Sequence, residues 1–425
     1  MRFNFRRIKM IAHSDVLIIG GGIIGAACAC ELARRGASVT VIDKGEIGSG
    51  CSYGSAGWVT PCFAFPLPMP GTLLRSLKWM LDRDSPLYLK PSLNLGTIRW
   101  LLRFMRSMTV RQMLRSVAAL TELSAISLGA YQQLNAEQPG ALGFQQRGLL
   151  MVAQTAKGYQ SARRELELVG QHNIVGRELD ADEVKDLEPA ITGSKICGGV
   201  YFPNEAHVEP HATVLTLLRS AQKYGASVHP KTEVFDFVTD GRHVIGADTT
   251  AGFVGADSIV LAAGAWSGRI ARTLKLHIPM LSGKGYAVIV EKPTPTPVIP
   301  CMLIEKKVAV TPREHGLRLA GTLELVDLDE SITVRRVNAI LNGARQYLSV
   351  PADPQVIEVW RGLRPCTPDG VPIIGRVPGF DNVVVATGHQ MLGLQTAPAT
   401  ASLVADLVAG QTPIVDPQPF RVDRF

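Results

Sequence analysis

The sequence predicts an α/β fold that begins with a parallel nucleotide-binding sheet, and three observations near the N-terminus support this prediction. The apolar, β-branched run Asp15–Gly20 is typical of a short buried strand. A helical apolar run, Ile24–Leu32, follows it and is closed by Gly36. A second strand, Ala37–Asp43, then ends in an acidic residue. Alternation of strands and helices in this order is typical of a parallel sheet.

The turn after the first strand fits the G-x-G-x-x-G pattern of dinucleotide binding. Gly20 permits the tight turn, Gly22 lets backbone approach a pyrophosphate, and Gly25 lets helix and strand pack closely. The helix N-terminus offers free N–H groups to phosphate. The acid at position 43 can accept the adenosine ribose hydroxyls. The dinucleotide contacts predicted here are Gly20, Gly22, Ile23, Ile24, Gly25, Asp43 and Lys44.

Composition and charge narrow the class of protein. The 425 residues suffice for two or three structural units, and 46% hydrophobic with 19% charged residues is typical of globular proteins. The net charge of +7 gathers in the N-terminal arm and in the region 75–115, but no nucleic-acid-binding motif accompanies it, so we expect no nucleic-acid partner. Seven scattered cysteines form no CxxC pair and no zinc spacing, which favours reduced thiols in a cytoplasm and no metal site.

Three further segments favour FAD. The glycine-rich run Gly50–Trp58 follows the second strand, Asp257–Ser267 reads as strand, glycine turn and helix start, and Val383–Gly393 opens another strand-to-helix turn before the predicted helix Ala397–Leu407. Together they resemble the D-amino acid dehydrogenase (small-subunit type) and glycine oxidase-like family of FAD-dependent amine oxidoreductases. The resemblance covers nearly the whole chain, and Val228–Phe237 matches the third strand of its sheet. The FAD contacts that it implies are Ser52, Tyr53, Gly54, Ala56, Gly57, Val234, Ala263, Gly264, Trp266, Gly388, Met391, Leu392 and Gly393.

The resemblance implies a Rossmann-type FAD-binding domain interleaved with a substrate domain that contains an antiparallel sheet and helices, so that the chain is α+β overall. We expect the FAD domain at 12–62, 196–280 and 357–425, and the substrate domain at 63–195 and 281–356. Family members usually have glycine where this chain has Gln390. Related sarcosine oxidases bind flavin covalently through a cysteine, but Gly362 stands at the matching place, so we expect non-covalent FAD.

The resemblance also implies the substrate site. Arg364, which precedes a proline, would bind the substrate carboxylate through two parallel hydrogen bonds, and the alternative is a structural salt bridge between domains. Tyr286, on the predicted strand Gly285–Glu291, would lie over the substrate, with an ordinary core tyrosine as the alternative. His389 and Tyr53 would border the flavin and the pocket, and packing roles are their alternatives.

The implied reaction is hydride transfer from the Cα–H of a small D-amino acid to flavin N5, which leaves an imine. D-Proline and 4-hydroxy-D-proline are substrates within this family, and they serve here as examples of the small D-amino acid that we expect. The electrons would pass to a quinone or a partner protein. Three alternatives stay open: an oxygen-using oxidase of glycine, sarcosine or another secondary amine, an NAD-dependent dehydrogenase, and an FAD-binding subunit that is inactive without a partner.

The region Leu73–Met108 mixes apolar and aromatic residues, among them Trp79, Trp100 and Phe104, with basic ones such as Arg75, Lys78, Arg99, Arg103 and Arg106. Such a stretch can lie on an anionic bilayer, which would place a cytoplasmic enzyme peripherally on the inner face of the cell membrane. The alternative is a set of amphipathic helices packed on the substrate domain. The sequence contains no evident transmembrane helix.

Overall fold

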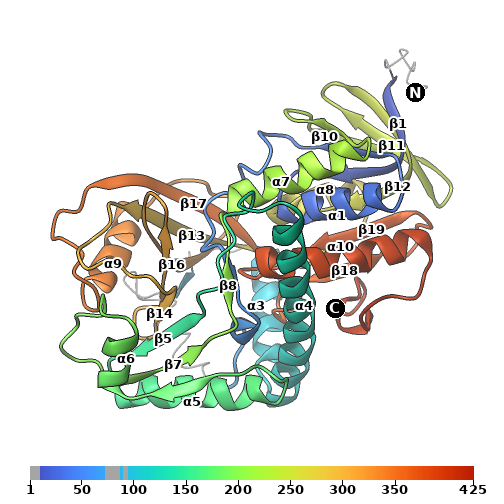
Figure 1. Ribbon diagram of the computed structural model, residues 1–425. Coiled ribbons are helices and arrows are strands. Elements are labelled where there is room, and N and C mark those ends of the chain that lie inside the picture. Colours follow the sequence, from blue (N-terminus) through green and yellow to red (C-terminus); the bar gives the residue numbers. More distant parts are fainter. Residues whose placement is uncertain (1–9, 72–86, 90–93) are drawn as a thin grey trace.

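The computed structural model describes residues 10–71, 87–89 and 94–425. Two large sheets dominate it, and helices pack against both (Figure 1). The basic N-terminal arm and much of the Leu73–Met108 region lie outside the described residues.

The first sheet is the predicted parallel sheet. Strands run in the parallel order β9-β2-β1-β12-β19, and the antiparallel hairpin β10–β11 joins the other end of β12. Nucleotides bind at the carboxyl edge of such a sheet. Its strands are β1 (Met10–Ile19), β2 (Val39–Ile42), β9 (Ser227–His229), β10 (Val234–Asp240), β11 (His243–Thr249), β12 (Gly252–Leu261), β18 (Ile373–Arg376) and β19 (Val383–Thr387).

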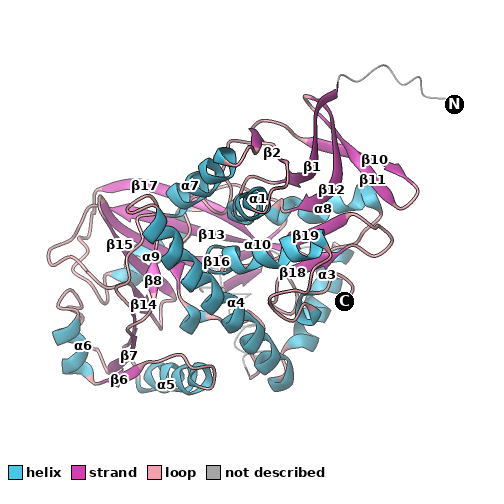
Figure 2. Ribbon diagram, turned by 45° about the vertical axis from the view of Figure 1, so that its right-hand side comes forward, coloured by secondary structure: helices cyan, strands magenta, loops and turns pink. Residues whose placement is uncertain are grey.

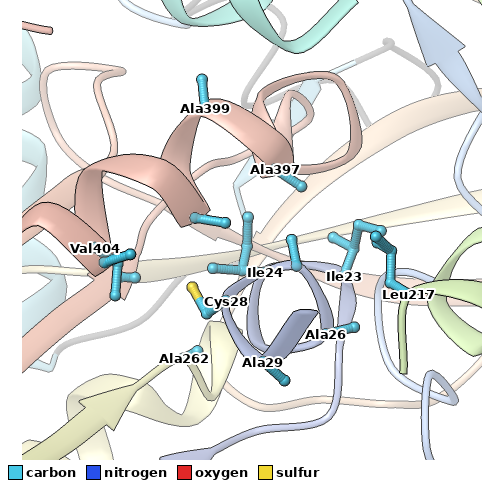
Figure 3. Packing of buried hydrophobic residues seen from close by; sticks show 14 of the residues in the cluster. Ile23, Ile24, Ala26, Cys28, Ala29, Leu217, Ala262, Ala397, Ala399 and Val404 are labelled. Atoms are coloured by element: carbon cyan, nitrogen blue, oxygen red, sulfur yellow. The ribbon is translucent and has the colours of Figure 1, made fainter. Parts of the chain in front are cut away.

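Small side chains allow the helices of this unit to pack closely. Helix α1 (Ile23–Arg34) contacts both α7 (Pro210–Lys223) and α10 (Gly393–Ala409), and α4 (Val110–Glu137) packs on α10. Figure 3 shows the Cys28 sulfur directed from α1 towards α10. Burial raises the pKa of this thiol to about 12, so it stays protonated and packs as a small apolar group.

The second sheet is largely antiparallel, and Figure 2 labels β13, β16 and β17 among its strands. Its order is β17-β13-β16-β15-β14-β5-β7-β6, with β4 beside β16. Its strands are β4 (Leu87–Leu89), β5 (Leu149–Ala153), β6 (Arg177–Leu179), β7 (Gly198–Phe202), β13 (Leu281–Val290), β14 (Cys301–Leu303), β15 (Val308–Arg313), β16 (Gly316–Val326) and β17 (Val356–Cys366). The helices of this part of the chain are α3 (Leu95–Ser107), α5 (Ala156–Gly170), α6 (Ala181–Leu187) and α9 (Val334–Ala344).

Short elements connect the two sheets. The ribbon of β3 (Trp58–Val59) and β8 (Ala206–His207) lies between them. The remaining elements are α8 (Ser267–Ala271) and the 3-10 helices η1 (Pro61–Phe63), η2 (Gly264–Trp266), η3 (Arg272–Leu274) and η4 (Gln418–Phe420).

The predicted α/β fold with a Rossmann-type sheet is confirmed. The prediction of one continuous strand over Val228–Phe237 is wrong: β9 ends at His229, and β10 begins only at Val234. Pro230 has no N–H to donate to a ladder, and Lys231 adopts a φ of 55°, so the chain turns between the two strands.

The division into two domains stays a prediction, but hydrogen bonding bears on its boundaries. Both β7 and β17 pair within the second sheet, although our ranges assigned them to the FAD domain. The chain therefore crosses between the sheets several residues away from the predicted positions.

Candidate functional site

A cavity of about 1070 Å³ lies between the two sheets. It runs from the glycine-rich turn after β1, past the N-terminus of α10, to the face of the second sheet. Ligand sites of small molecules are usually about 300–1000 Å³, so this cavity suffices for a large ligand together with a small one. Most of the predicted cofactor residues line this cavity, but Gly25, Tyr53 and Gly388 do not.

The glycine-rich turn has no room for side chains. A Cβ atom at Gly20, where φ is +116°, would lie 2.5 Å from the Ala262 carbonyl oxygen. A Cβ atom at Gly25 would lie 1.8 Å from the Gly20 carbonyl oxygen. Glycine at both places therefore lets α1 begin directly against β1 and β12, with its N-terminus at the cavity.

Two polar side chains fix this turn. The Ser52 hydroxyl accepts a hydrogen bond of 2.9 Å from the amide of Ile23. One carboxylate oxygen of Asp43 accepts from the Gly21 amide at 2.7 Å, and the other accepts from Gly45 at 2.8 Å. Asp43 thus holds the turn in place while it also lines the cavity.

Lys44 and Trp266 form one end of the cavity. The Lys44 ammonium lies 3.9 Å from the centre of the Trp266 ring, which is close enough for a cation–π interaction. Val234, Ala263 and Gly264 complete this end. An aromatic and apolar surface beside a cation suits the adenosine half of a dinucleotide.

The glycine-rich segment 50–58 forms another wall. A Cβ atom at Gly54 would lie 2.3 Å from the Trp360 ring, and one at Gly57, where φ is +79°, would lie 2.3 Å from the Val208 carbonyl oxygen. Gly54, Ser55, Ala56 and Gly57 all line the cavity.

The N-terminus of α10 points at the cavity through Leu392, Gly393 and Leu394. Among the described residues, no acceptor pairs with the amides of Gly393 and Leu394, so their N–H groups are available to a ligand. Just ahead, Gly388 adopts a φ of +78° against Thr367, and Gln390 adopts a φ of 51°. The left-handed backbone at Gln390 is one that glycine adopts more readily than a residue with a side chain.

Arg364 is one of the cations that line the cavity on the side of the second sheet. It stands on β17, and its Nη1 donates to the Thr322 carbonyl oxygen at 3.0 Å. A Cβ atom at Gly285 would lie 1.9 Å from Nη1, so this glycine makes room for the guanidinium. No carboxylate among the described residues lies within 4.0 Å, and burial lowers the pKa of the arginine. A partly buried cation without a counter-ion is a site for a ligand carboxylate.

Thr322 and Trp360 are wall residues that the sequence reasoning missed. Opposite Gly285, β16 carries a bulge at which Thr322 adopts a φ of 57°. The Thr322 hydroxyl and the Trp360 indole nitrogen are both buried, and neither has a hydrogen-bond partner among the described residues. Both line the cavity near Arg364 and could bind substrate. The only signal in the sequence that could have indicated their position is the set of glycines on the paired strands around them, such as Gly285 and Gly362.

Of the other three predicted substrate-site residues, only His389 lines the cavity. Tyr286 lies outside the cavity, fully buried on the opposite face of β13, where its hydroxyl donates to Glu324 at 2.6 Å. Tyr53 also lies outside the cavity wall, and its ring centre is 5.0 Å from that of His211. His389 lines the cavity, but burial lowers its pKa to about 3, so it is neutral near pH 7.

Metal ligands and membrane spans were sought in the described part of the chain. There, no three histidine, cysteine or acidic side chains gather as metal ligands would. None of its helices has both the length and the hydropathy needed to cross a bilayer.

Comparisons with known proteins are consistent across sequence and structure. The family model described as FAD dependent oxidoreductase matches residues 15–407. A D-amino acid dehydrogenase of Paramagnetospirillum magneticum is 32% identical over 427 residues, covering 96% of this chain and 98% of that protein. Glycine oxidase from Geobacillus kaustophilus superimposes with a TM-score of 0.80 at 25% identity, covering 97% and 99% of the two chains. L-Proline dehydrogenase from P. horikoshii shares the fold, with a TM-score of 0.74 at 22% identity and coverage of 97% and 98%.

Proposed function

The chain belongs to the FAD-dependent oxidoreductase family, and on this premise we propose that it oxidises D-amino acids to imino acids. The observation that carries the proposal is Arg364, a cation at the substrate end of the cavity that has no carboxylate partner among the described residues. The imino acid forms when the substrate loses two electrons and two protons, and water then hydrolyses it to a 2-oxo acid and ammonium.

The residues at the other end of the cavity fit FAD. Side chains are excluded at Gly20 and Gly25, so backbone amides can approach a pyrophosphate. We assign the ribose to Asp43 and the adenosine end to Lys44 and Trp266. We assign the flavin ring to the segment 52–57 and to the N-terminus of α10, whose free amides stabilise negative charge. When bound, FAD supplies the acceptor for the hydride equivalent of the substrate Cα–H.

Substrate binding follows from the neighbourhood of Arg364. The guanidinium binds the α-carboxylate through two charge-assisted hydrogen bonds. The unpaired Thr322 hydroxyl and Trp360 indole N–H then orient the substrate from the sheet side. Because the neutral, weakly basic His389 also shares its Nε2 with the Thr400 hydroxyl at 3.1 Å, we assign it packing rather than proton transfer. We assign Tyr286 a structural role because it lies outside the cavity and its hydroxyl donates to Glu324.

FAD binds without a covalent bond in this proposal. Cys366 is the nearest cysteine along the chain to Arg364, and it is buried with a pKa raised to about 12. Cys51 lines the cavity, but burial raises its pKa as well. Neither thiol is therefore disposed to form a thioether as a thiolate. Denaturation in trichloroacetic acid should release all flavin from the protein.

A surface on α3 supports peripheral contact with an anionic membrane, where a quinone would accept the electrons. Four exposed apolar side chains stand at helical spacing on one face, and the arginines between and beside them have no carboxylate partner among the described residues. The apolar residues are Leu95, Ile98, Leu102 and Met105, and the arginines are Arg99, Arg103 and Arg106. The opposite face of the helix is buried through Trp100 and Phe104.

Vesicle sedimentation tests this surface. The protein should sediment with vesicles that contain phosphatidylglycerol and remain in solution with vesicles of phosphatidylcholine alone. The double variant Ile98→Glu, Leu102→Glu should lose this binding, while Val175→Glu, at an exposed valine on the loop after α5, should retain it. Equal sedimentation of both variants with anionic vesicles would remove the membrane part of the proposal.

An anaerobic spectral titration tests the oxidation. The purified protein should show flavin absorbance, and at least one D-amino acid should bleach it while the L-enantiomer does not. A flavin that no D-amino acid bleaches contradicts the proposal. Rapid oxygen uptake during turnover would instead identify an oxidase, and slow oxygen uptake with fast reduction of a soluble quinone supports the dehydrogenase.

A further inference from the structure

The cavity continues beyond Arg364 along the face of the second sheet. Its floor there consists of small side chains, Ala320 on β16 and Ala309 on β15, and it reaches Met302 on β14. These three residues lie side by side across neighbouring strands. Neighbouring strands are about 4.8 Å apart, so the arm extends about 10 Å from the strand that bonds Arg364.

Aromatic rings form one wall of this arm. Trp58, Phe63 and Phe65 all line the cavity and contact one another edge to face, with ring centres 5.9 Å and 6.5 Å apart. Rings in this arrangement offer an apolar surface with negative faces, which suits an alkyl chain or a cation.

Glu165 stands at the far end of the arm. It lies on α5 one turn after Ser161 and lines the cavity together with Lys307. The residue is half-buried, and desolvation raises the pKa of its carboxyl while Lys307 and a hydrogen bond with Ser161 lower it. Within the described residues, no cation lies within 4.0 Å of this carboxylate. Lys307 acts on it electrostatically from a greater distance.

The length of the arm, from the strand that bonds Arg364 to Met302, suits one class of substrate. An extended chain advances about 1.2 Å per covalent bond, so the six bonds from the carboxylate carbon to the side-chain nitrogen of lysine span about 7 Å. A hydrogen bond of about 2.9 Å at the far end brings the total to about 10 Å.

We propose that this arm makes the enzyme selective for D-amino acids with a long cationic side chain, such as D-lysine. The α-carboxylate binds Arg364, the alkyl chain crosses the alanine floor, and the terminal cation pairs with Glu165 beside the aromatic wall. This inference rests on the proposed function, whose site it extends. A neutral side chain of equal length leaves the Glu165 carboxylate desolvated without a cation in contact with it, and an anionic one is repelled by it.

Binding of two unreactive carboxylates to the holoenzyme tests the inference without turnover. Both 6-aminohexanoate and hexanoate can occupy Arg364, and they differ in the terminal cation. Titration of the flavin absorbance should give a Kd at least tenfold lower for 6-aminohexanoate in the wild-type protein. Glu165→Gln should abolish this preference, and Glu165→Asp should keep part of it. The matched control Glu167→Gln, at an exposed carboxylate on the same helix, should keep all of it.

Anaerobic flavin reduction separates this inference from the proposed function. The efficiency of flavin reduction by D-lysine, divided by that for D-norleucine, should be about 10- to 100-fold lower in Glu165→Gln than in the wild-type protein. Only the value for D-lysine should change. If D-norleucine bleaches the flavin as well as D-lysine does, in wild type and variant alike, the function stands and the selectivity is refuted. If neither D-lysine nor any neutral D-amino acid bleaches it, the proposed function fails first.

Discussion

The assignment of Arg364 as the carboxylate anchor predicts that its removal weakens substrate binding strongly and changes the stability of the fold little. Each charge-assisted hydrogen bond to a substrate contributes about 1.5–3 kcal/mol, so the loss of two costs about 3–6 kcal/mol. At 1.4 kcal/mol per tenfold, Arg364→Met should raise the apparent Kd of the substrate about 10²- to 10⁴-fold. Arg364→Lys keeps the charge but not the two parallel bonds, and we expect about 10- to 100-fold.

Stability decides between this reading and a structural ion pair. In the absence of substrate, Arg364 has one hydrogen bond, to the Thr322 carbonyl oxygen, and no carboxylate within reach among the described residues. Removal therefore costs about 1 kcal/mol, partly offset by the relief of a desolvated charge, and the Tm should change by less than about 4 °C. Stopped-flow flavin reduction and differential scanning fluorimetry measure the two quantities. A large loss of Tm with an unchanged apparent Kd would refute the anchor.

Three further predictions concern other buried positions. Gly285→Ala should displace the anchor guanidinium and raise the apparent Kd at least tenfold, whereas Gly129→Ala, on α4 with open space around it, should leave the Kd unchanged. Gly25→Ala should yield protein with far less bound FAD by absorbance, because its Cβ would overlap the backbone of the turn; full occupancy would contradict that packing. Glu205, whose pKa burial raises to about 8, stays protonated in the fold while the unfolded chain ionises near 4.5. Stability should therefore fall from pH 4.5 to 8, by on the order of a few kcal/mol, and Glu205→Gln should lose this dependence in urea unfolding at each pH.

The sequence predicts the first half of the site well because that half is local. The turn from Gly20 to Gly25, the following helix and the acid at the end of β2 lie within 24 consecutive residues, and each glycine there answers a steric requirement of its neighbours. Short-range geometry of this kind can be inferred from spacing alone. The expected positions of Asp43 and Gly264 at the cavity follow from the same parallel strand order.

The second half depends on pairings that the sequence does not contain. Along β13, Ala287 packs in the same cluster as Met302 and Ala309, which line the cavity, so Tyr286 necessarily faces the opposite core. A shift of one residue in register would exchange these faces, and the sequence alone does not distinguish the two registers. The bulge that places Thr322 beside the cavity arises from the pairing of β13 with β16 across 37 residues of chain (322 − 285), and no local signal marks it.

Two strained residues meet at the segment that carries the anchor, and this coincidence gives the bulge a function. Thr322 and Gln390 both adopt left-handed backbone, which costs a residue with a side chain on the order of 1–3 kcal/mol. The Thr322 carbonyl oxygen accepts from the Arg364 guanidinium, and the Gln390 amide donates to the Pro365 carbonyl oxygen at 3.1 Å. The two strained residues belong to different parts of the chain. One holds the side chain of Arg364, and the other holds the backbone of Pro365. A guanidinium fixed in this way before substrate arrives loses little freedom on binding, which is the condition under which two hydrogen bonds yield their full contribution.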